Sequence, residues 1–413
     1  MKYDEIKAKL SRAMNDAIAD NEVAGVNILV TKDDNEIIYA QEGMADKEAG
    51  RPMSRDAIFR MYSMTKPITA TAAMILMERG QIDLGQPVAD FIPVYAKQKV
   101  YDAKTDSFVE PHRAMCIKDL LNMTSGLVYG DGETVAGKAM GKVIDDAQAG
   151  LEEDIKAYGS GKAQETGYQK KQMSTLEFAE RLGECPLAFE PGSSWQYGTS
   201  ADVLGAVIEI AGGMKLSEFM QKEIFEPLGM RDTAFWVPLE KRDRLAAAYD
   251  TYRDADGKHI QRFDRNNLAV SNCMAFEPAY LAGGAGLAST IDDYMKFASM
   301  LLHGGSYEGK RIISQRTVDY MTGAGLEPQQ RDGMRENIDM PGFSYSNFMR
   351  VCTEPSHYTG LAVEGEYGWD GWLGMYFANI PKENMTILMG TQRTDAGTFG
   401  LTKKLRNIIL SQL

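Results

Sequence analysis

A serine and a lysine three residues apart, Ser63 and Lys66, are the side chains of this sequence best suited to covalent chemistry. Residues at this spacing share one face of a helix, so the lysine amine can reach the serine hydroxyl if a helix begins at about residue 63. The free N–H groups and positive end of a first helical turn also favour negative charge on the serine Oγ. A neutral lysine could accept the hydroxyl proton and leave a nucleophilic serine. The same pattern also fits an N-cap serine beside a solvated lysine.

The residues that follow this pair predict a buried helix. Pro67 fits its first turn, where the N–H groups have no partner within the helix. The run from Ile68 to Met77 is mostly apolar, and Gly80 marks the C-terminal end. Lysine side chains are seldom buried without a partner or a role, so a lysine that opens this helix favours the chemical interpretation.

Tyr197 is the third candidate for proton transfer. It follows a Pro191–Gly192 turn and lies just before an expected helix start, at which Thr199 or Ser200 would serve as the N-cap. A tyrosine beside a lysine can share the role of base, because each group lowers the pKa of the other by charge compensation. The alternative is an aromatic core residue with a satisfied hydroxyl.

The elements that must position these residues come from both ends of the chain. Hydrophobic patterning predicts a helix over residues 2–20, strand pairs over 25–30 with 36–40 and over 375–380 with 385–390, and a closing helix over 401–413. The predicted fold is α+β, with one antiparallel sheet flanked by the N- and C-terminal helices and a mainly helical second lobe. We expect a sheet domain of residues 1–80 and 276–413, a helical domain of residues 81–275, and an active site between them. Residues 130–172 are predicted to be loops and exposed helix that could form a lid.

Composition limits the class of ligand. The 413 residues include 45 basic and 58 acidic side chains, a net charge of −13, which argues against nucleic acid or an anionic membrane surface as a partner. The four cysteines and four histidines are scattered, so we expect free thiols, no metal site and no cofactor. The charged start Met1–Leu10 lacks the apolar core of a signal peptide, and no run reaches membrane-spanning length. We therefore expect a cytoplasmic protein that acts on a neutral or cationic small molecule.

Five stretches of the sequence follow one another in a characteristic order. They are Ser63–Lys66, Leu120–Leu127, Pro191–Tyr197, Gly283–Asp293 with Ser289-Thr290 as a helix cap, and Leu301–Gly305 together with Gly309–Ile312. In this order they resemble the serine β-lactamase superfamily, specifically its class C-like branch, and most of all the family VIII carboxylesterases. The branch also includes class C β-lactamases, D-alanyl-D-alanine peptidases and related acyltransferases. The resemblance covers nearly the whole chain.

The resemblance implies a role for each candidate residue. Ser63 would attack the acyl carbon, Lys66 and Tyr197 would move its proton, and a covalent acyl-enzyme would form and be hydrolysed. The backbone N–H groups of Ser63 and Trp372 would form the oxyanion hole, with Trp372 on an edge strand that has unpaired donors. Tyr129 would lie over the acyl pocket and contact the substrate, although an ordinary loop tyrosine is an equally good interpretation.

Two departures from the superfamily pattern bear on the substrate. Thr199 stands at the Asn position of the Tyr-x-Asn motif, so an amide that would bind a substrate carbonyl is lost. Trp369-Asp370-Gly371 matches the Lys-Thr-Gly motif, with tryptophan in place of the lysine that helps to hold a substrate carboxylate. We therefore expect Trp369 and Gly371 to line a pocket for an apolar acyl or alcohol group. The main hypothesis is hydrolysis of small carboxylic esters through Ser63. The alternatives are a β-lactamase, a D-amino-acid peptidase or another amide hydrolase, an acyltransferase, and a non-catalytic ligand-binding sensor.

Overall fold

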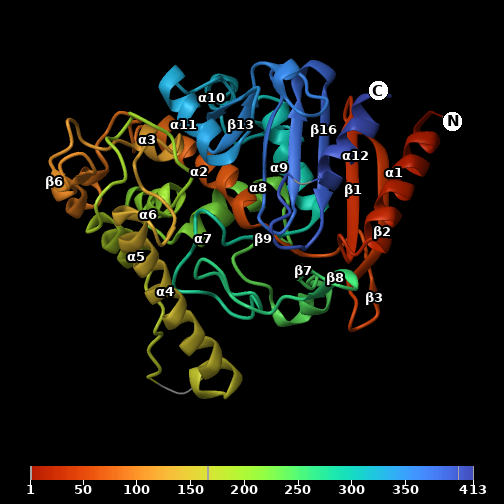
Figure 1. Cartoon of the computed structure of the whole chain (residues 1–413), viewed down its shortest axis with the longest axis horizontal. Coiled ribbons are helices and arrows are strands. Elements are labelled where there is room, and N and C mark those ends of the chain that lie inside the picture. Colours follow the sequence, from red (N-terminus) through yellow and green to blue (C-terminus); the bar gives the residue numbers. More distant parts are fainter. Residues whose placement is uncertain (1, 165–166, 399, 413) are drawn as a thin grey trace.

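An eight-stranded antiparallel sheet forms the centre of the structure (Figure 1). The structure is a computed structural model that describes residues 2–164, 167–398 and 400–412. The strands lie in the order β12 (Phe343–Ser346), β13 (Met349–Cys352), β14 (Tyr367–Asp370), β15 (Tyr376–Ile380), β16 (Met385–Gly390), β1 (Gly25–Lys32), β2 (Asn35–Asp46) and β3 (Arg51–Pro52). Because β16 pairs with β1, the prediction that both ends of the chain build one antiparallel sheet is confirmed.

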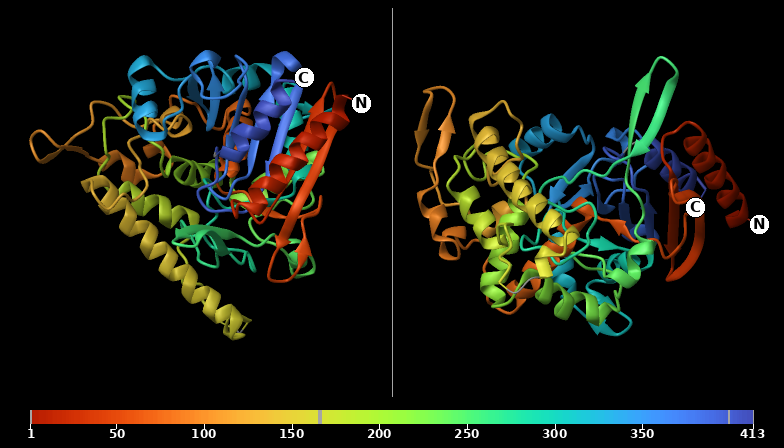
Figure 2. Two further views of the ribbon diagram at one scale, coloured as in Figure 1. Left: turned by 45° about the vertical axis from the view of Figure 1, so that its right-hand side comes forward. Right: turned by 90° about the horizontal axis from the view of Figure 1, so that it is seen from below.

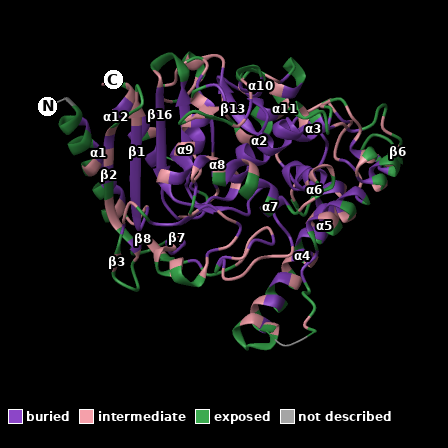
Figure 3. Cartoon of the chain, turned by 180° about the vertical axis from the view of Figure 1, so that it is seen from behind, coloured by how far each residue is buried: buried purple, intermediate pink, exposed green. Residues whose placement is uncertain are grey.

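The terminal helices cover one face of this sheet. α1 (Lys2–Ala19) and α12 (Gly400–Leu410) pack their apolar stripes against the same side of β1, β15 and β16. The other face carries α9 (Ile291–Leu302) and the larger hydrophobic core. The central strands are consequently buried on both faces, as Figure 3 shows. The predicted α+β class with flanking terminal helices is therefore confirmed.

Residues 81–275 are mainly helical, as predicted. Their helices are α3 (Ile117–Leu121), α4 (Val135–Gly159), α5 (Thr175–Gly183), α6 (Ser200–Gly212), α7 (Leu216–Met220) and α8 (Glu226–Leu228). α2 (Thr65–Glu78) is buried from Thr65 to Leu76 and packs against α6 and α7. The start of α2 therefore lies where the sheet meets these helices.

Two features of this segment differ from expectation. Residues 130–172, predicted to be loops and exposed helix, contain the 25-residue helix α4, which is partly buried and whose second half extends away from the molecule in Figures 1 and 2. Its glycines and charges obscure a buried stripe that includes Met140, Val143 and Leu151. Two hairpins were not predicted either, and both project in Figure 2: β5 (Val100–Asp102) with β6 (Ser107–Val109), and β7 (Tyr249–Asp254) with β8 (Gly257–Arg262). The lid and the two domain boundaries stay predictions.

The hairpin of β12 and β13 was also missed. Its turn residues, Asn347 and Phe348, have φ angles of 48° and 65°, the left-handed conformation that a two-residue hairpin turn requires. Without a glycine, such a turn is hard to recognise from residue types. The turn is held from outside, because Asn122 Oδ1 accepts a hydrogen bond from the Asn347 N–H at 3.0 Å and the Leu121 carbonyl accepts one from the Phe348 N–H at 2.9 Å.

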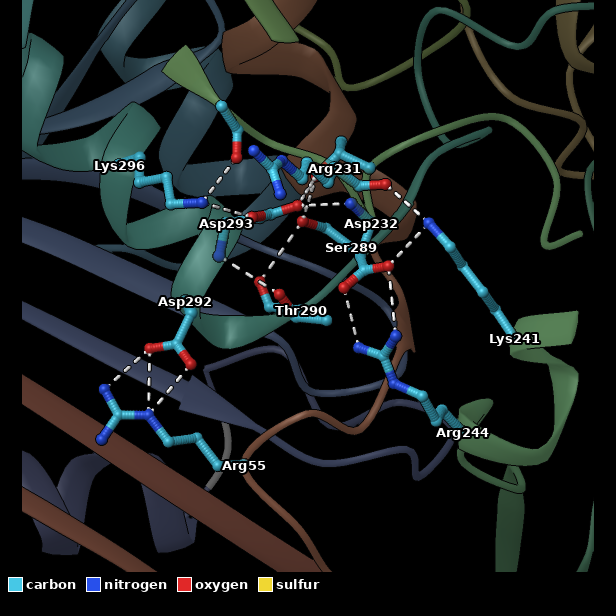
Figure 4. Close-up of polar contacts among 12 residues, drawn as sticks. Arg55, Arg231, Asp232, Lys241, Arg244, Ser289, Thr290, Asp292, Asp293 and Lys296 are labelled. Carbon is cyan, nitrogen blue, oxygen red and sulfur yellow. Dashed lines mark hydrogen bonds and ion pairs between the residues drawn. The ribbon is translucent and has the colours of Figure 1, made fainter. Parts of the chain in front are cut away.

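A polar network fixes the N-terminus of α9 (Figure 4). Thr290 caps the helix, as predicted, by accepting a hydrogen bond from the Asp293 N–H at 3.2 Å. Asp293 accepts one from the Asp232 N–H at 2.7 Å and forms an ion pair with Lys296 at 2.8 Å. Asp232 in turn pairs with Arg244 at 2.8 Å. The start of α9 is therefore tied to the segment that follows α8.

Four further short elements lie between α9 and β12. They are β10 (Ser306–Tyr307), β11 (Lys310–Arg311), α10 (Gln315–Met321) and α11 (Pro328–Ile338). α11 reaches the helical segment, where Asn337 Oδ1 accepts a hydrogen bond from the Tyr197 N–H at 3.0 Å. Within the described ranges, no helix is long and apolar enough to cross a membrane.

Candidate active site

Ser63 and Lys66 meet at the start of α2, as their spacing predicts. Ser63 lies in a 3₁₀ turn (Tyr62–Met64) that runs directly into α2. Lys66 Nζ donates a hydrogen bond to Ser63 Oγ at 3.3 Å, and the lysine is 0% exposed. Tyr62 has a φ of 44°, a left-handed conformation that is unfavourable for tyrosine. The backbone is therefore strained directly before the candidate nucleophile, as it often is at functional sites.

Two short strands place a glycine loop beside this pair. β4 (Phe59–Arg60) leads towards Ser63 and pairs with β9 (Ala288–Ser289), which follows the loop Gly283–Gly286. The α9 network in Figure 4 holds β9 from the other side, where Ser289 Oγ lies 2.7 Å from Thr233 Oγ1. The loop is thus fixed relative to the nucleophile.

Burial makes the Lys66 amine easier to deprotonate. Removal from water lowers the pKa of Lys66 to about 8, and the carboxylate of Asp202 opposes this shift. The amine also donates to the Gly284 carbonyl oxygen at 2.8 Å and to the Tyr129 hydroxyl at 3.2 Å. Lys66 can therefore exist as a free amine at mildly alkaline pH, which a general base for Ser63 requires.

Gly284 separates Lys66 from Asp202. Its carbonyl oxygen accepts from Lys66 at 2.8 Å, and its N–H donates to Asp202 Oδ1 at 3.0 Å. A Cβ at this position would lie 3.2 Å from Lys66 Nζ and 3.0 Å from Asp202 Oδ2, so a side chain there would press on both groups. Burial raises the pKa of Asp202, and the nearby Lys66 opposes that rise. The loop therefore keeps a buried cation and a buried carboxyl group apart but electrostatically coupled.

Tyr197 joins the pair from the helical segment. Its ring centroid lies 4.6 Å from Lys66 Nζ, and its hydroxyl accepts a hydrogen bond from Trp369 Nε1 at 3.0 Å. Burial raises the pKa of Tyr197, while hydrogen bonding with Ser63 and Trp369 opposes the rise. A phenol with a raised pKa is neutral at the pH where Lys66 loses its proton. Lys66 therefore stays the candidate base, and Tyr197 stays a candidate hydroxyl for relaying the proton.

Two of the sequence motifs pack together to hold Tyr197. A Cβ on Gly198 would lie 2.2 Å from the Leu127 carbonyl oxygen, so the two backbones can approach only at a glycine. The hydroxyls of Ser125 and Ser200 are hydrogen-bonded at 2.8 Å. The motif Leu120–Leu127 therefore contacts the residues that directly follow the motif Pro191–Tyr197.

The predicted N-cap position of the following helix is confirmed, but the expected capping hydrogen bond is not formed. Thr199 occupies the N-cap position of α6, but its side chain makes no capping hydrogen bond. Its buried Oγ1 has no partner within the described part of the chain. Ser200 bonds to Ser125 instead of capping the helix. Residue types locate a helix start, but they do not determine which way a small hydroxyl turns.

The expected edge-strand origin of the oxyanion hole is also wrong, because β14 lies between β13 and β15. Trp372 lies beyond the end of β14, and no hydrogen bond is found for its backbone N–H or for that of Ser63 among the residues that the structure describes. Gly371 brings the two segments together, since a Cβ there would lie 2.2 Å from the Met61 carbonyl oxygen. Two free N–H groups on adjoining segments are the donors that a tetrahedral oxyanion needs.

Aromatic side chains occupy the predicted substrate-binding positions. Ring centroids are 5.6 Å apart for Tyr197 and Trp369 and 5.8 Å apart for Tyr129 and Tyr197. Trp369 is only 4% exposed and packs between Tyr197 and Tyr345, so it does not face an open pocket. Tyr129 lines a groove of about 490 Å³ together with the first turns of α4 and residues 266–268. The substrate-binding role of Tyr129 stays a prediction.

Asp202 and Gly284 are the site residues that sequence reasoning missed. Asp202 stands in the first turn of α6, where acidic residues are common because of the helix dipole. Gly284 is one of several glycines in its loop, and nothing in the local sequence marks it out. Among the described residues, no group of three or more histidine, cysteine or carboxylate side chains could hold a metal ion.

The rate of ester cleavage is expected to rise with pH through the pKa of Lys66. Burial lowers this pKa to about 8, so the neutral form that can accept the Ser63 proton is the high-pH form. We expect kcat/KM to fall about tenfold for each pH unit below that pKa and to level off above it. A profile with p-nitrophenyl butyrate at constant ionic strength measures this. A flat profile on both sides of pH 8 would contradict the assignment of Lys66 as base.

Comparison with known proteins identifies the class. The family model described as Beta-lactamase matches residues 10–409. The chain is 28% identical over 421 residues to Esterase EstB of Burkholderia gladioli, covering 98% of this chain and 96% of that protein. It is 28% identical over 331 residues to lovastatin esterase of Penicillium rubens, covering 78% and 74% of the two chains.

Two solved structures share the fold. EstCE1, described as a hydrolase with promiscuous acyltransferase activity, matches with a TM-score of 0.77 at 22% identity and covers 98% of this chain and 99% of its own. The simvastatin synthase LovD of Aspergillus terreus matches with a TM-score of 0.74 at 22% identity, covering 98% of both chains. The chain belongs to the β-lactamase family, as its motifs predicted. It is a serine hydrolase of that superfamily.

Proposed function

We propose that this protein hydrolyses small carboxylic esters through a covalent acyl-enzyme on Ser63. The observation that carries the proposal is the fully buried Lys66 amine, which lies 3.3 Å from Ser63 Oγ and has its pKa lowered to about 8. The competing interpretation, an N-cap serine beside a surface lysine, requires a solvated and fully charged amine. The burial of Lys66 does not fit that interpretation.

The reaction would proceed in two steps. Ser63 Oγ attacks the ester carbonyl carbon while its proton passes to Lys66, directly or through the Tyr197 hydroxyl, and the N–H groups of Ser63 and Trp372 bind the developing oxyanion. The proton then passes to the leaving alcohol as the ester C–O bond breaks, which leaves the acyl group on Ser63. Water attacks the acyl carbon and gives its proton to Lys66 by the same route. That proton then passes to Ser63 Oγ as the bond between Oγ and the acyl carbon breaks, which releases the carboxylic acid and restores the serine.

Trp369 supports a neutral substrate. It replaces the lysine that holds a carboxylate elsewhere in the superfamily, and its indole N–H donates to the Tyr197 hydroxyl at 3.0 Å. Two of the relatives carry the names Esterase EstB and lovastatin esterase. We therefore favour a small-molecule ester over a β-lactam or a D-amino-acid peptide as the substrate. A cytoplasmic location stays a prediction.

Turnover of p-nitrophenyl butyrate compared with that of a chromogenic cephalosporin tests the substrate class. We expect kcat/KM for the ester to be at least about 100-fold higher, because the cephalosporin carries a carboxylate that would lack its usual cationic partner. The Ser63→Ala variant, measured in parallel, corrects for spontaneous hydrolysis. Cephalosporin turnover equal to ester turnover would overturn the assignment.

Acyl transfer is the second candidate function. One relative, 28% identical over 327 residues, is named monacolin J acid methylbutanoyltransferase of Aspergillus terreus. Hydrolysis and transfer share the acyl-enzyme and differ only in whether water or an alcohol attacks it. Product analysis of ester turnover in the presence of butanol separates the two, since a hydrolase yields mainly butyric acid and a transferase yields mainly butyl butyrate.

A further inference from the structure

We propose that Asp370 and Asp395 are positioning residues for an oxyanion donor, the backbone N–H of Trp372. The inference rests on the proposed function, because it assigns this N–H to the oxyanion hole. Both carboxylates act by holding the turn Gly371–Gly374, which we call the oxyanion turn. Neither is expected to contact the substrate.

The sheet alone does not fix the oxyanion turn. β14 ends at Asp370, so Trp372 is outside the strand ladder. Within the turn, the Gly374 N–H bonds to the Gly371 carbonyl at 2.8 Å, and the Gly371 N–H bonds to the Met375 carbonyl at 2.7 Å. These two bonds close the turn but leave the Trp372 N–H unbonded. An oxyanion donor is effective only when it points at the developing charge, so other contacts must set its direction.

Residues 393–398, which lie between β16 and α12, contact the oxyanion turn directly. We call them the clamp segment. Trp372 Nε1 donates to Asp395 Oδ1 at 2.7 Å, and the Ala396 N–H donates to the Trp372 carbonyl at 3.0 Å. The clamp segment therefore binds the side chain and the backbone of the same residue. Asp395 has a φ of 52°, so its backbone adopts an unusual conformation where it presents the carboxylate.

The Trp372 indole also links the turn to the nucleophile. Its ring centroid lies 5.0 Å from that of Tyr62 and 5.4 Å from that of Phe263, and both contacts are edge-to-face. Tyr62 directly precedes Ser63, whose N–H is the other oxyanion donor. By fixing the indole at its N–H, Asp395 fixes the spacing of the two donors.

Asp370 anchors the start of the turn from the opposite face of the sheet. Successive residues of a strand point to opposite faces, so Asp370 points away from the side on which Trp369 meets Tyr197. Asp370 Oδ1 accepts a hydrogen bond from Arg350 Nη1 at 2.8 Å and one from Thr398 Oγ1 at 2.9 Å. The side chains of Arg350 and Asp370 are 3% and 17% exposed, so this ion pair is largely shielded from water. It ties β13, β14 and the clamp segment together.

The two carboxylates therefore tie the oxyanion turn to the clamp segment. Asp395, within the clamp segment, binds the Trp372 indole, and Asp370, directly before the turn, binds Thr398. Loss of either contact would let the Trp372 peptide reorient without removing any group that touches the substrate. The Trp372 N–H stabilises the oxyanion of the transition state more than it stabilises the carbonyl of the bound ester. Such a change is expected to lower kcat while KM changes little.

The variants Asp395→Ala and Trp372→Phe test the first contact. Phenylalanine keeps an aromatic ring at position 372 but lacks the indole N–H. Each variant is expected to lower kcat for p-nitrophenyl butyrate by about tenfold per active site, with KM within about twofold of the wild type, because a donor that is displaced but not removed retains part of its effect. Affinity for phenylboronic acid, which forms a tetrahedral serine adduct, should fall by the same factor. The double variant should lose no more than either single variant, and Asp395→Asn, which keeps an acceptor, should restore most of the rate.

Thr398→Val tests the second contact without leaving the buried Arg350 unpaired, as Asp370→Ala would. We expect kcat to fall about threefold, since one hydroxyl-to-carboxylate hydrogen bond is lost while the Arg350–Asp370 ion pair remains. Asp106→Ala is the matched control. Asp106 accepts a hydrogen bond from the Tyr101 hydroxyl at 2.8 Å in the exposed turn of the β5–β6 hairpin. This control should leave kcat and boronate affinity unchanged.

The outcomes separate this inference from the function on which it rests. Wild-type kcat and boronate affinity in Asp395→Ala and Thr398→Val would overturn the inference alone. A loss of rate that matches a loss of titratable active sites would also overturn it, because the carboxylates would then support folding only. Ester turnover that survives Ser63→Ala would overturn the proposed function and the inference together.

Discussion

Replacing Ser63 with alanine is expected to lower kcat/KM for p-nitrophenyl butyrate by at least about 10³-fold. Alanine keeps the backbone N–H of residue 63 but removes the Oγ that lies 3.3 Å from Lys66 Nζ. The neighbouring hydroxyls of Tyr129 and Tyr197 cannot replace it as a nucleophile at neutral pH, because burial raises the pKa of both. Initial-rate measurements at several ester concentrations test this expectation.

The melting temperature is the control for this variant. Ser63 is only partly buried, so its truncation opens no large cavity and the variant should melt close to the wild type. A folded Ser63→Ala protein that turns over the ester at the wild-type rate would show that another residue is the nucleophile.

Replacing Lys66 with methionine is expected to lower kcat by about 10²- to 10⁴-fold, the usual contribution of a general base. Methionine is similar in length and can fill the fully buried site without a charge. It cannot accept the Ser63 proton, so the activity that remains should no longer rise through pH 8. Measurements of kcat against pH for the wild type and the variant test both expectations.

The two readouts for Lys66→Met have different meanings. A low rate that still rises through pH 8 would show that another group titrates there and that Lys66 contributes only to binding or structure. A rate equal to that of the wild type would remove Lys66 from the mechanism. The melting temperature of the variant separates either result from misfolding, which has to be checked because the Gly284 carbonyl loses a buried hydrogen-bond donor.

The central strands could be predicted from the sequence because their residues form short apolar runs beside recognisable turns. Gly25–Val30 and Met385–Gly390 are both of this kind. β12 and β13 could not, because their turn at Asn347 and Phe348 contains no glycine and depends on contacts from residues 121 and 122. The exposed helix expected within residues 130–172 is present, but the length and the buried stripe of α4 were not predicted, because glycines and charges interrupt its pattern. Local residue patterns therefore located individual elements, whereas a turn that depends on tertiary contacts left no such pattern.

Site residues could be predicted where they lie close together in the sequence or belong to a short motif. Ser63 and Lys66 are one helical turn apart, so their contact follows from the sequence. Trp372 could be proposed only from the family resemblance, and the reason given for its free N–H was wrong. Asp202 and Gly284 reach Lys66 through tertiary contacts, for which the sequence contains no spacing rule.

The structure changes the interpretation of Trp369, which stands in place of the lysine of the superfamily motif. From the sequence, it replaces a carboxylate-binding lysine and predicts an apolar wall. In the structure, the indole is 4% exposed and donates to the Tyr197 hydroxyl at 3.0 Å. Trp369 therefore orients a residue of the proton relay, and any effect on substrate preference comes with an effect on that relay.

Intact-mass spectrometry after treatment with diethyl p-nitrophenyl phosphate tests most directly whether Ser63 is an activated nucleophile. We expect a single phosphoryl adduct per chain, located on the peptide that contains Ser63 and absent from the Ser63→Ala variant. The rate of labelling should increase as Lys66 loses its proton, through a pKa of about 8. An unmodified wild-type chain, as expected of a non-catalytic ligand-binding protein, or an adduct on a residue other than Ser63, would contradict this assignment.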